Sequence, residues 1–274
     1  MTMSLVHMGI TSVCSHAWVY FDNRIVVANL DARGEGMIFA FSFLFLANIV
    51  VGNASLRYVS VSLVQIVRSS IPMFTMALSY WLLQKRYTRP EIMSLVPLVF
   101  GVAIASIGEV EFHMLGFMLT VLVCFLSSLK SVLTSKFLSN SYRLHPLDLL
   151  RRMSLYAFFL LLPLVWIIER PHMLDEWKGN GDPFSYFVLL VSGFMAFALN
   201  ISNFETTKKT SALTVTVAGN VKHILTIVLS IVIFKNPISS TNFLGSVVAI
   251  GGAAWYSKET YSKNTKGSGG KSVV

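Results

Sequence analysis

Long apolar runs separated by short polar connections recur from one end of the chain to the other. Each run is close to the ~20 residues that a helix needs to cross about 30 Å of hydrocarbon. Such runs predict an all-α, polytopic transmembrane helix bundle. We expect nine helical spans, over residues 1–21, 36–55, 60–84, 92–108, 112–138, 149–169, 184–204, 211–234 and 241–257.

The connections between these spans are too short to hold a separate soluble domain. We therefore predict one transmembrane transporter domain over residues 1–257. The remaining residues, 258–274, are rich in Lys, Ser and Gly, a composition that favours a disordered tail.

Composition supports the membrane assignment and excludes other classes of protein. Hydrophobic residues make up 54% of the chain and charged residues only 13%, about half the share usual in soluble proteins. Both cysteines, Cys14 and Cys124, fall inside predicted spans, so we expect small packing residues and neither a disulfide framework nor a metal cluster. No HExxH sequence, nucleophile elbow or phosphate-binding glycine loop occurs. We expect no enzyme activity, no cofactor and no metal.

The net charge of +9 comes mostly from Lys and Arg in connections and in the tail. The odd-numbered connections and the tail carry fourteen of these bases, and the opposite side carries four. Bases accumulate on the cytoplasmic side of membrane proteins. The charge therefore predicts a cytoplasmic C-terminus and not a nucleic-acid surface.

An internal repeat relates the two halves of the chain. A shift of 151 residues places 58–106 over 209–257 without a gap, and matches Ser60 with Ser211 and Gly101 with Gly252. The shift pairs the third and fourth spans with the eighth and ninth. A shift of five spans reverses the direction of the helices, as in the inverted repeats of many secondary transporters. A five-plus-five plan requires a helix before Met1, so we expect that a first helix is missing.

Three cations lie well inside predicted spans: Arg68, Lys130 and Lys222. Arg68 is eight residues past Ser60, about 12 Å deep, and Lys222 is eleven past Ser211, about 16 Å deep. A charge near the centre of a span costs about 2.5–3.5 kcal/mol. Long side chains can reduce this cost by reaching back to the interface. No acidic residue lies at similar depth, so we expect an anionic ligand, a phosphate or diphosphate, to compensate these charges.

The predicted helices are weakened next to two of these cations. Pro72 cannot donate a hydrogen bond to the carbonyl of Arg68 and should kink the third span there. Gly219 and Asn220, both poor helix formers, precede Lys222. Transporter sites commonly form at such interruptions. His223 is a further candidate to donate a hydrogen bond to a phosphate group, although it is adjacent to Lys222 and adjacent residues do not share a helix face.

Three segments resemble one family of transporters. Residues 202–257, with the motifs TSALTV, GNVK and FKNPIS, resemble the C-terminal part of the triose-phosphate and nucleotide-sugar translocator family of the drug/metabolite transporter superfamily. Its fourth helix resembles LRYVSVSLVQIVRSSIPMFT, residues 56–75, and its sixth resembles SSLKSVLTSKFL, residues 127–138. The likeness extends along nearly the whole chain.

This resemblance implies ten helices in two inverted halves and antiport of a phosphorylated sugar or nucleotide sugar. Its substrate-binding bases correspond to Arg68 and Lys222. His223 stands where plastid-type phosphate translocators have a second strong base, which argues against triose phosphate as the cargo. AGNVK stands where GDP-mannose carriers have GALNK, which argues against that cargo.

We therefore predict an antiporter of the Golgi or endoplasmic reticulum membrane that exchanges a cytosolic nucleotide sugar for a lumenal nucleoside monophosphate. Asn203 and Asn220 are candidates to orient the sugar or base. The expected partners are the anionic substrate, membrane lipids and, as a further option, a second copy of the chain in a homodimer. Two alternatives remain: a sugar-phosphate/phosphate translocator, and a non-transporting regulatory or truncated relative.

Overall fold

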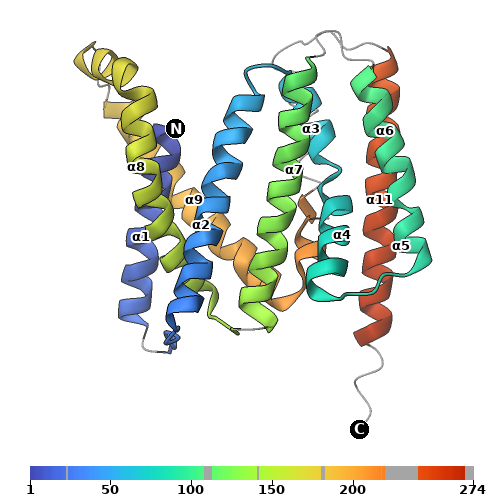
Figure 1. Ribbon diagram of the computed structural model, residues 1–274, viewed down its shortest axis with the longest axis horizontal. Helices are drawn as coiled ribbons and strands as arrows, with labels where there is room; N and C mark the ends of the chain where they lie inside the picture. Colours follow the sequence, from blue (N-terminus) through green and yellow to red (C-terminus); the bar gives the residue numbers. More distant parts are fainter. Residues whose placement is uncertain are drawn as a thin grey trace. The chain divides into compact units, whose positions relative to one another are not determined.

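The computed structural model describes residues 1–22, 24–107, 113–140, 142–179, 183–216, 218–219 and 240–268. These residues form helices and connections, and no strand occurs among them. The helices, labelled in Figure 1, are α1 (Thr2–Phe21), α2 (Ala32–Ser55), α3 (Val61–Arg68), α4 (Ile71–Leu83), α5 (Arg89–Met93), α6 (Leu95–Ile107), α7 (Met114–Ser135), the π-helical turn η1 (Lys136–Asn140), α8 (Pro146–Gly179), α9 (Pro183–Lys209) and α11 (Ser240–Ser268). The all-α prediction is confirmed.

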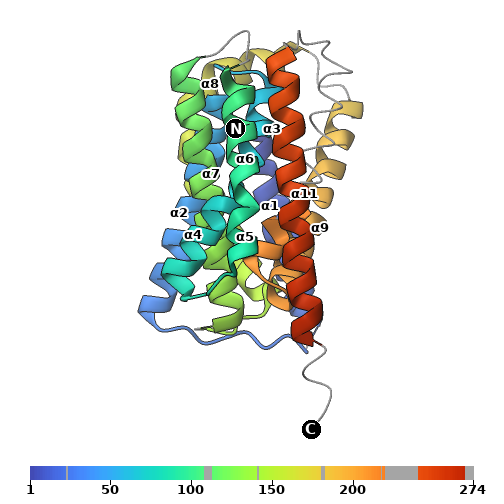
Figure 2. The same ribbon diagram turned by 90° about the vertical axis from the view of Figure 1, so that its right-hand side faces the viewer.

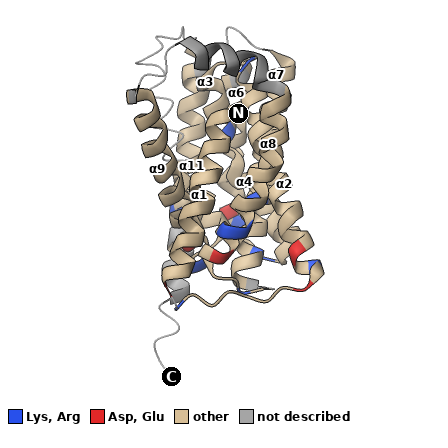
Figure 3. Cartoon of the chain, turned by 90° about the vertical axis from the view of Figure 1, so that its left-hand side faces the viewer, with Lys and Arg blue, Asp and Glu red and all other residues tan. Residues whose placement is uncertain are grey.

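Five segments among the described residues are long and apolar enough to cross a bilayer: Ala32–Ser55, Leu63–Leu83, Met114–Ser139, Pro146–Ile167 and Phe184–Lys209. Each overlaps a predicted span. Most of the described Lys, Arg, Asp and Glu residues lie near helix ends, and the long middle stretches carry few of them (Figure 3). This distribution is the one expected of helices that cross a membrane.

The chain divides into two compact units. Unit 1 contains Met1–Val50 and Leu133–Lys209, and unit 2 contains Val51–Val132 and Thr210–Val274. Two of the boundaries fall inside α2 and α7, and the third falls at the end of α9. In unit 1, α1 packs against α8 and α9. Its core lies around Ile38, Phe41, Leu149, Leu150 and Met153, all at most 1% exposed.

Unit 2 is built on α3, α4, α6, α7 and α11. One of its cores combines Leu63, Val64 and Ile66 of α3 with Ala105 of α6 and Cys124 of α7, all at most 1% exposed. Further along the chain, α4 contributes Met76 and α11 contributes the fully buried Tyr256 to a second cluster. These contacts hold the two pieces of the third predicted span, α3 and α4, inside the unit.

Helices α6 and α11 of unit 2 run side by side in opposite directions (Figures 1 and 2). Glycines allow their backbones to touch. A Cβ atom on Gly101 would lie 2.2 Å from the backbone nitrogen of Ala249, and a Cβ atom on Gly252 would lie 2.4 Å from that of Leu98. A shift of 151 residues converts one contact into the other, because 101 becomes 252 and 98 becomes 249. The contact is therefore symmetric in the predicted repeat.

The same repeat holds at two helix starts in unit 2. The Ser60 hydroxyl accepts a hydrogen bond of 3.1 Å from the backbone N–H of Leu63, and its carbonyl accepts one from Val64. The matching residue, Ser211, accepts a bond of 3.2 Å from the N–H of Thr214, and its carbonyl accepts one from Val215. Both serines are N-caps, the role that serine favours. The predicted repeat therefore extends to local hydrogen bonding.

Three helix boundaries differ from the prediction. The predicted span 92–108 is divided into α5 and α6 at Ser94, since Pro97 has no N–H to donate to the carbonyl of Met93. Helix α8 continues past 169 to Gly179. Helix α11 continues to Ser268, through residues that were predicted to be disordered. A hydrogen bond of 3.2 Å from Trp255 Nε1 to Glu259 Oε1, one turn apart, supports this extension.

Candidate functional site

The third predicted span is broken at Arg68, as Pro72 indicated. Helix α3 ends at Arg68 and α4 begins at Ile71, with Ser69 and Ser70 between them. Pro72 lies in the first turn of α4, where a helix does not use that N–H. The hydroxyls of Ser69 and Ser70 each donate a 2.6 Å hydrogen bond back to the last turn of α3, to the carbonyls of Ile66 and Val67. The two serines of the break therefore satisfy carbonyl groups at the end of α3.

Helix α7 holds the break from one side. Cys124 Sγ donates to the carbonyl of Val67 over 3.5 Å, just before the break. The Ser128 hydroxyl lies 3.0 Å from the carbonyl of Ile71, just after it, and 2.8 Å from that of Cys124. Cys124 and Ser128 are fully buried and one helical turn apart. The interruption is therefore a fixed feature of unit 2.

Arg68 occupies the end of α3 at this break. Its side chain is half-buried, and its Nε atom is buried without a hydrogen-bond partner among the residues that the structure describes. No described carboxylate forms an ion pair with it. Its terminal atom Nη2 lies next to Gly52, in the last turn of α2. A guanidinium in this state is costly unless an anion binds it, and phosphate oxygens are its preferred partners.

The other predicted site residues have different outcomes. Lys130 is half-buried on α7, in the same unit as Arg68. Asn203 is exposed on α9 and belongs to unit 1. Asn220, Lys222 and His223 lie outside the described residues, so their place in the site stays a prediction.

Two features of the site were missed by the sequence analysis. Cys124 was interpreted as a packing residue, and the structure shows that its thiol also donates to the carbonyl of Val67. Gly52 was not considered at all. The spacing of Cys124 and Ser128, two small polar residues four positions apart in an apolar span, is the signal that could have indicated a shared helix face.

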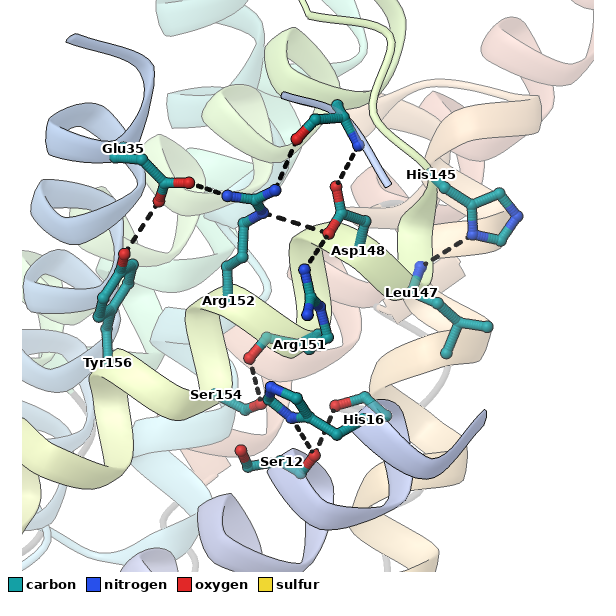
Figure 4. Close-up of polar contacts among 12 residues, drawn as sticks. Ser12, His16, Glu35, His145, Leu147, Asp148, Arg151, Arg152, Ser154 and Tyr156 are labelled. Carbon is teal, nitrogen blue, oxygen red and sulfur yellow. Dashed lines mark hydrogen bonds and ion pairs between the residues drawn. The ribbon is translucent and has the colours of Figure 1, made fainter. Parts of the chain in front are cut away.

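Unit 1 contains two arginines that, unlike Arg68, have carboxylate partners (Figure 4), although the Nε atom of Arg151 is also buried without a hydrogen-bond partner among the described residues. Arg151 and Arg152 donate to the fully buried carboxylate of Asp148 over 3.0 and 3.2 Å, and Arg152 also pairs with Glu35. Arg152 donates to the carbonyl of Ala28 over 2.6 Å. Glu35 accepts a further bond of 2.9 Å from the Tyr156 hydroxyl.

The net charge of this cluster is zero, because it contains two arginines and two carboxylates: Arg151, Arg152, Asp148 and Glu35. Their hydrogen bonds join α8 to the start of α2 and to the connection that precedes it, where the backbone N–H of Ala28 donates to Asp148 over 3.2 Å. We interpret this cluster as structural. No group of three or more residues suited to bind a metal occurs within the described part of the chain.

Comparisons with known proteins agree with the membrane assignment. Residues 1–257 match the sequence model of the Triose-phosphate Transporter family. A probable sugar phosphate/phosphate translocator of Arabidopsis thaliana is 34% identical, over 93% of this chain and 84% of its own length. From the same plant, a GDP-mannose transporter is 36% identical over 93% of this chain and 75% of its own. UDP-uronic acid transporter 1 of Arabidopsis thaliana is 33% identical, over 93% of this chain and 83% of its own length.

The fold also has a match among solved structures. A crystal structure superposes with a TM-score of 0.67 over 94% of this chain and 87% of its own, at 13% sequence identity. Members of the matched family are membrane transporters and not enzymes. The chain therefore belongs to the Triose-phosphate Transporter family and is a multi-pass membrane protein.

Proposed function

We propose that this chain is an antiporter that exchanges a cytosolic nucleotide sugar for a lumenal nucleoside monophosphate in a Golgi or endoplasmic reticulum membrane. Arg68 binds a phosphate group of both cargoes. Lys222 supplies a second contact to phosphate, and Lys130 lines the substrate cavity. His223, Asn220 and Asn203 orient the rest of the substrate.

The observation that carries this proposal is the state of Arg68. Its buried Nε lacks a hydrogen-bond partner within the described ranges, and it lies at a helix break that α7 holds in place. A phosphate accepts strong, charge-assisted hydrogen bonds from a guanidinium. A substrate that carries phosphate therefore compensates a charge that has no carboxylate partner among the described residues.

The relatives support a phosphorylated cargo. Two of the three transporters described above are named for nucleotide sugars, GDP-mannose and UDP-uronic acid. The third is named a sugar phosphate/phosphate translocator. That name favours a second candidate function, the exchange of a sugar phosphate for inorganic phosphate, in which Arg68 has the same role.

Exchange in liposomes tests both candidates. Purified protein is reconstituted in vesicles preloaded with UMP, GMP or phosphate, and labelled UDP-sugars, GDP-mannose and triose phosphate are offered outside. Uptake that requires a preloaded nucleotide supports the first function, and uptake that requires preloaded phosphate supports the second. Arg68→Ala should abolish exchange, whereas Arg57→Ala, which changes an exposed arginine of the same unit, should not. No exchange under any condition would point instead to a non-transporting relative.

A further inference from the structure

Gly52 is a buried glycine inside a helix, three residues before α2 ends. Glycine is the least favourable residue in a helix interior apart from proline. No glycine among the described residues has a positive φ, so backbone conformation does not require one here. The Gly52 carbonyl is also engaged, because it accepts a 2.8 Å hydrogen bond from the Ser55 hydroxyl. Neither backbone conformation nor hydrogen bonding therefore requires a glycine at this position.

The side chain of Arg68 lies directly beside this glycine. A Cβ atom on Gly52 would lie 3.4 Å from Arg68 Nη2 and 3.9 Å from Val123 Cγ2. The terminal nitrogen of the guanidinium therefore lies against the backbone of α2, with α7 beside it. Residues 52, 68 and 123 all belong to unit 2, so the contact is internal to one compact unit.

The size of a side chain at position 52 should decide whether this contact survives. An alanine Cβ at 3.4 Å from Nη2 is at the limit of ordinary van der Waals contact. A valine adds two methyl groups on a carbon that rotates little within a helix. At least one methyl would meet the guanidinium or Val123, and the flexible guanidinium is the group that can move.

We propose that Gly52 is a positioning residue for the anion site at Arg68. The absence of a side chain larger than a methyl group leaves room for the terminal nitrogen of the guanidinium, and so fixes the direction in which Arg68 presents its donors. This inference rests on the proposed role of Arg68 in binding phosphate. It differs from a packing role, in which Gly52 would only let α2 approach α7.

Equilibrium binding of UMP and of inorganic phosphate to the full chain tests the proposal. Gly52→Val should weaken UMP binding about tenfold or more, the loss expected for one hydrogen bond to a charged group. Gly52→Ala should weaken it only about twofold on the same scale. The matched control is Gly36→Val in the same helix, where an added Cβ meets nothing within 4 Å, and binding should not change.

Repeating the Gly52→Val test in the Arg68→Lys variant distinguishes a positioning role of Gly52 from a packing role. Arg68→Lys keeps the charge but lacks Nη2, so Gly52→Val should then cost less than about twofold, as expected for two residues that act through one contact. An equal loss in both backgrounds would overturn the inference. If the valine variant does not fold, Gly52→Ser replaces it, with a loss of about threefold expected and no loss as the contradicting result.

The outcome also distinguishes this inference from the proposed function. Unchanged UMP and phosphate binding by Arg68→Ala would overturn the proposed function, whatever Gly52 does. Lost binding by Arg68→Ala together with full binding by Gly52→Val would overturn only the role given to Gly52.

Discussion

The two units differ in whether their half-buried arginines have carboxylate partners. In unit 1, Arg151 and Arg152 share Asp148, and Arg152 also reaches Glu35, so each cation has a carboxylate within 3.2 Å. In unit 2, Arg68 has no carboxylate within the described residues. Its Nε has no partner there, as is also true of the Nε of Arg151, so the missing carboxylate is what sets Arg68 apart. A charge that the fold compensates needs no ligand. A charge left without compensation at a helix break is suited to bind one.

The largest effect is expected when the compensated cluster is opened. Arg152→Ala leaves the fully buried Asp148 with only one of its two arginines and leaves Glu35 without its ion pair. Breaking a fully buried pair costs about 3–5 kcal/mol. Because Glu35 is partly exposed and Asp148 keeps Arg151, the free energy of unfolding should fall by an amount at the lower end of this range, about 3 kcal/mol. Chemical unfolding in detergent measures it.

The affinity of folded Arg152→Ala for UMP should stay near that of the parent. If UMP binding were lost while stability stayed unchanged, the cluster of unit 1 would be a binding site and the contrast between the units would fail. Lys209→Ala is the control, because its pair with Glu205 is exposed and worth at most about 1 kcal/mol.

A somewhat smaller effect is expected from the glycine contact that joins α6 to α11 in unit 2. Gly252→Ala puts a methyl group 2.4 Å from the backbone nitrogen of Leu98, so the two helices must separate. Overpacking of this kind costs about 1–3 kcal/mol. Gly251→Ala is the matched control, because a Cβ there meets nothing within 4 Å and should leave stability unchanged or slightly raised.

Thermal unfolding of the two variants measures this difference. Equal stability would show that the symmetric contact of α6 and α11 is not close enough to need glycine.

A weaker effect is expected where α7 holds the break beside Arg68. Ser128→Ala removes a buried hydroxyl from the carbonyl of Ile71. One such bond contributes about 1 kcal/mol, so UMP affinity should fall by about threefold to fivefold if part of this energy positions Arg68. Ser42→Ala is the control, because this buried serine donates only to Ile38 in its own helix of unit 1. Equal affinity of both variants would show that the break holds without Ser128.

The smallest effect concerns pH at the edge of the compensated cluster. Burial, followed by the charge of Lys208, lowers the pKa of His145 below its ordinary value of 6.5, although Glu205, Asp148 and Asp22 act in the other direction. The neutral ring accepts a hydrogen bond from the N–H of Leu147.

A lowered pKa means that the unfolded chain binds the proton more readily than the folded chain. Stability should therefore be complete above pH 6.5 and decrease as the pH falls below that value. His145→Gln should flatten this dependence in unfolding experiments between pH 7.5 and about 5. An unchanged profile would assign the pH dependence to other groups.

Periodicity and local chemistry predicted much of this molecule. Long apolar runs located the helices, Pro72 located the break at Arg68, and a shift of 151 residues anticipated the matched caps at Ser60 and Ser211. Each of these features depends on residues close together in the chain or on a repeat within it. Such signals are readable without knowledge of packing.

Contacts between distant residues could not be predicted in this way. The bonds of Arg152 to Ala28 and Glu35 join positions more than a hundred residues apart, and nothing local distinguishes Arg152 from a cytoplasmic topology signal. The approach of Gly52 to Arg68 depends on how α2 and α3 pack. The division of the fourth predicted span at Ser94 was also missed, although Pro97 gave the same local signal there as Pro72 gave in the third span.

Thermal unfolding of Arg68→Ala with and without UMP tests the contrast between the two kinds of arginine in one experiment. Without UMP, the variant should be at least as stable as the parent, because it loses a half-buried charge that had no carboxylate partner among the described residues. Added UMP should raise the melting temperature of the parent and leave that of the variant unchanged. A variant that is strongly destabilised, as expected for Arg152→Ala, yet still stabilised by UMP would show that Arg68 is structural and that the anion binds elsewhere.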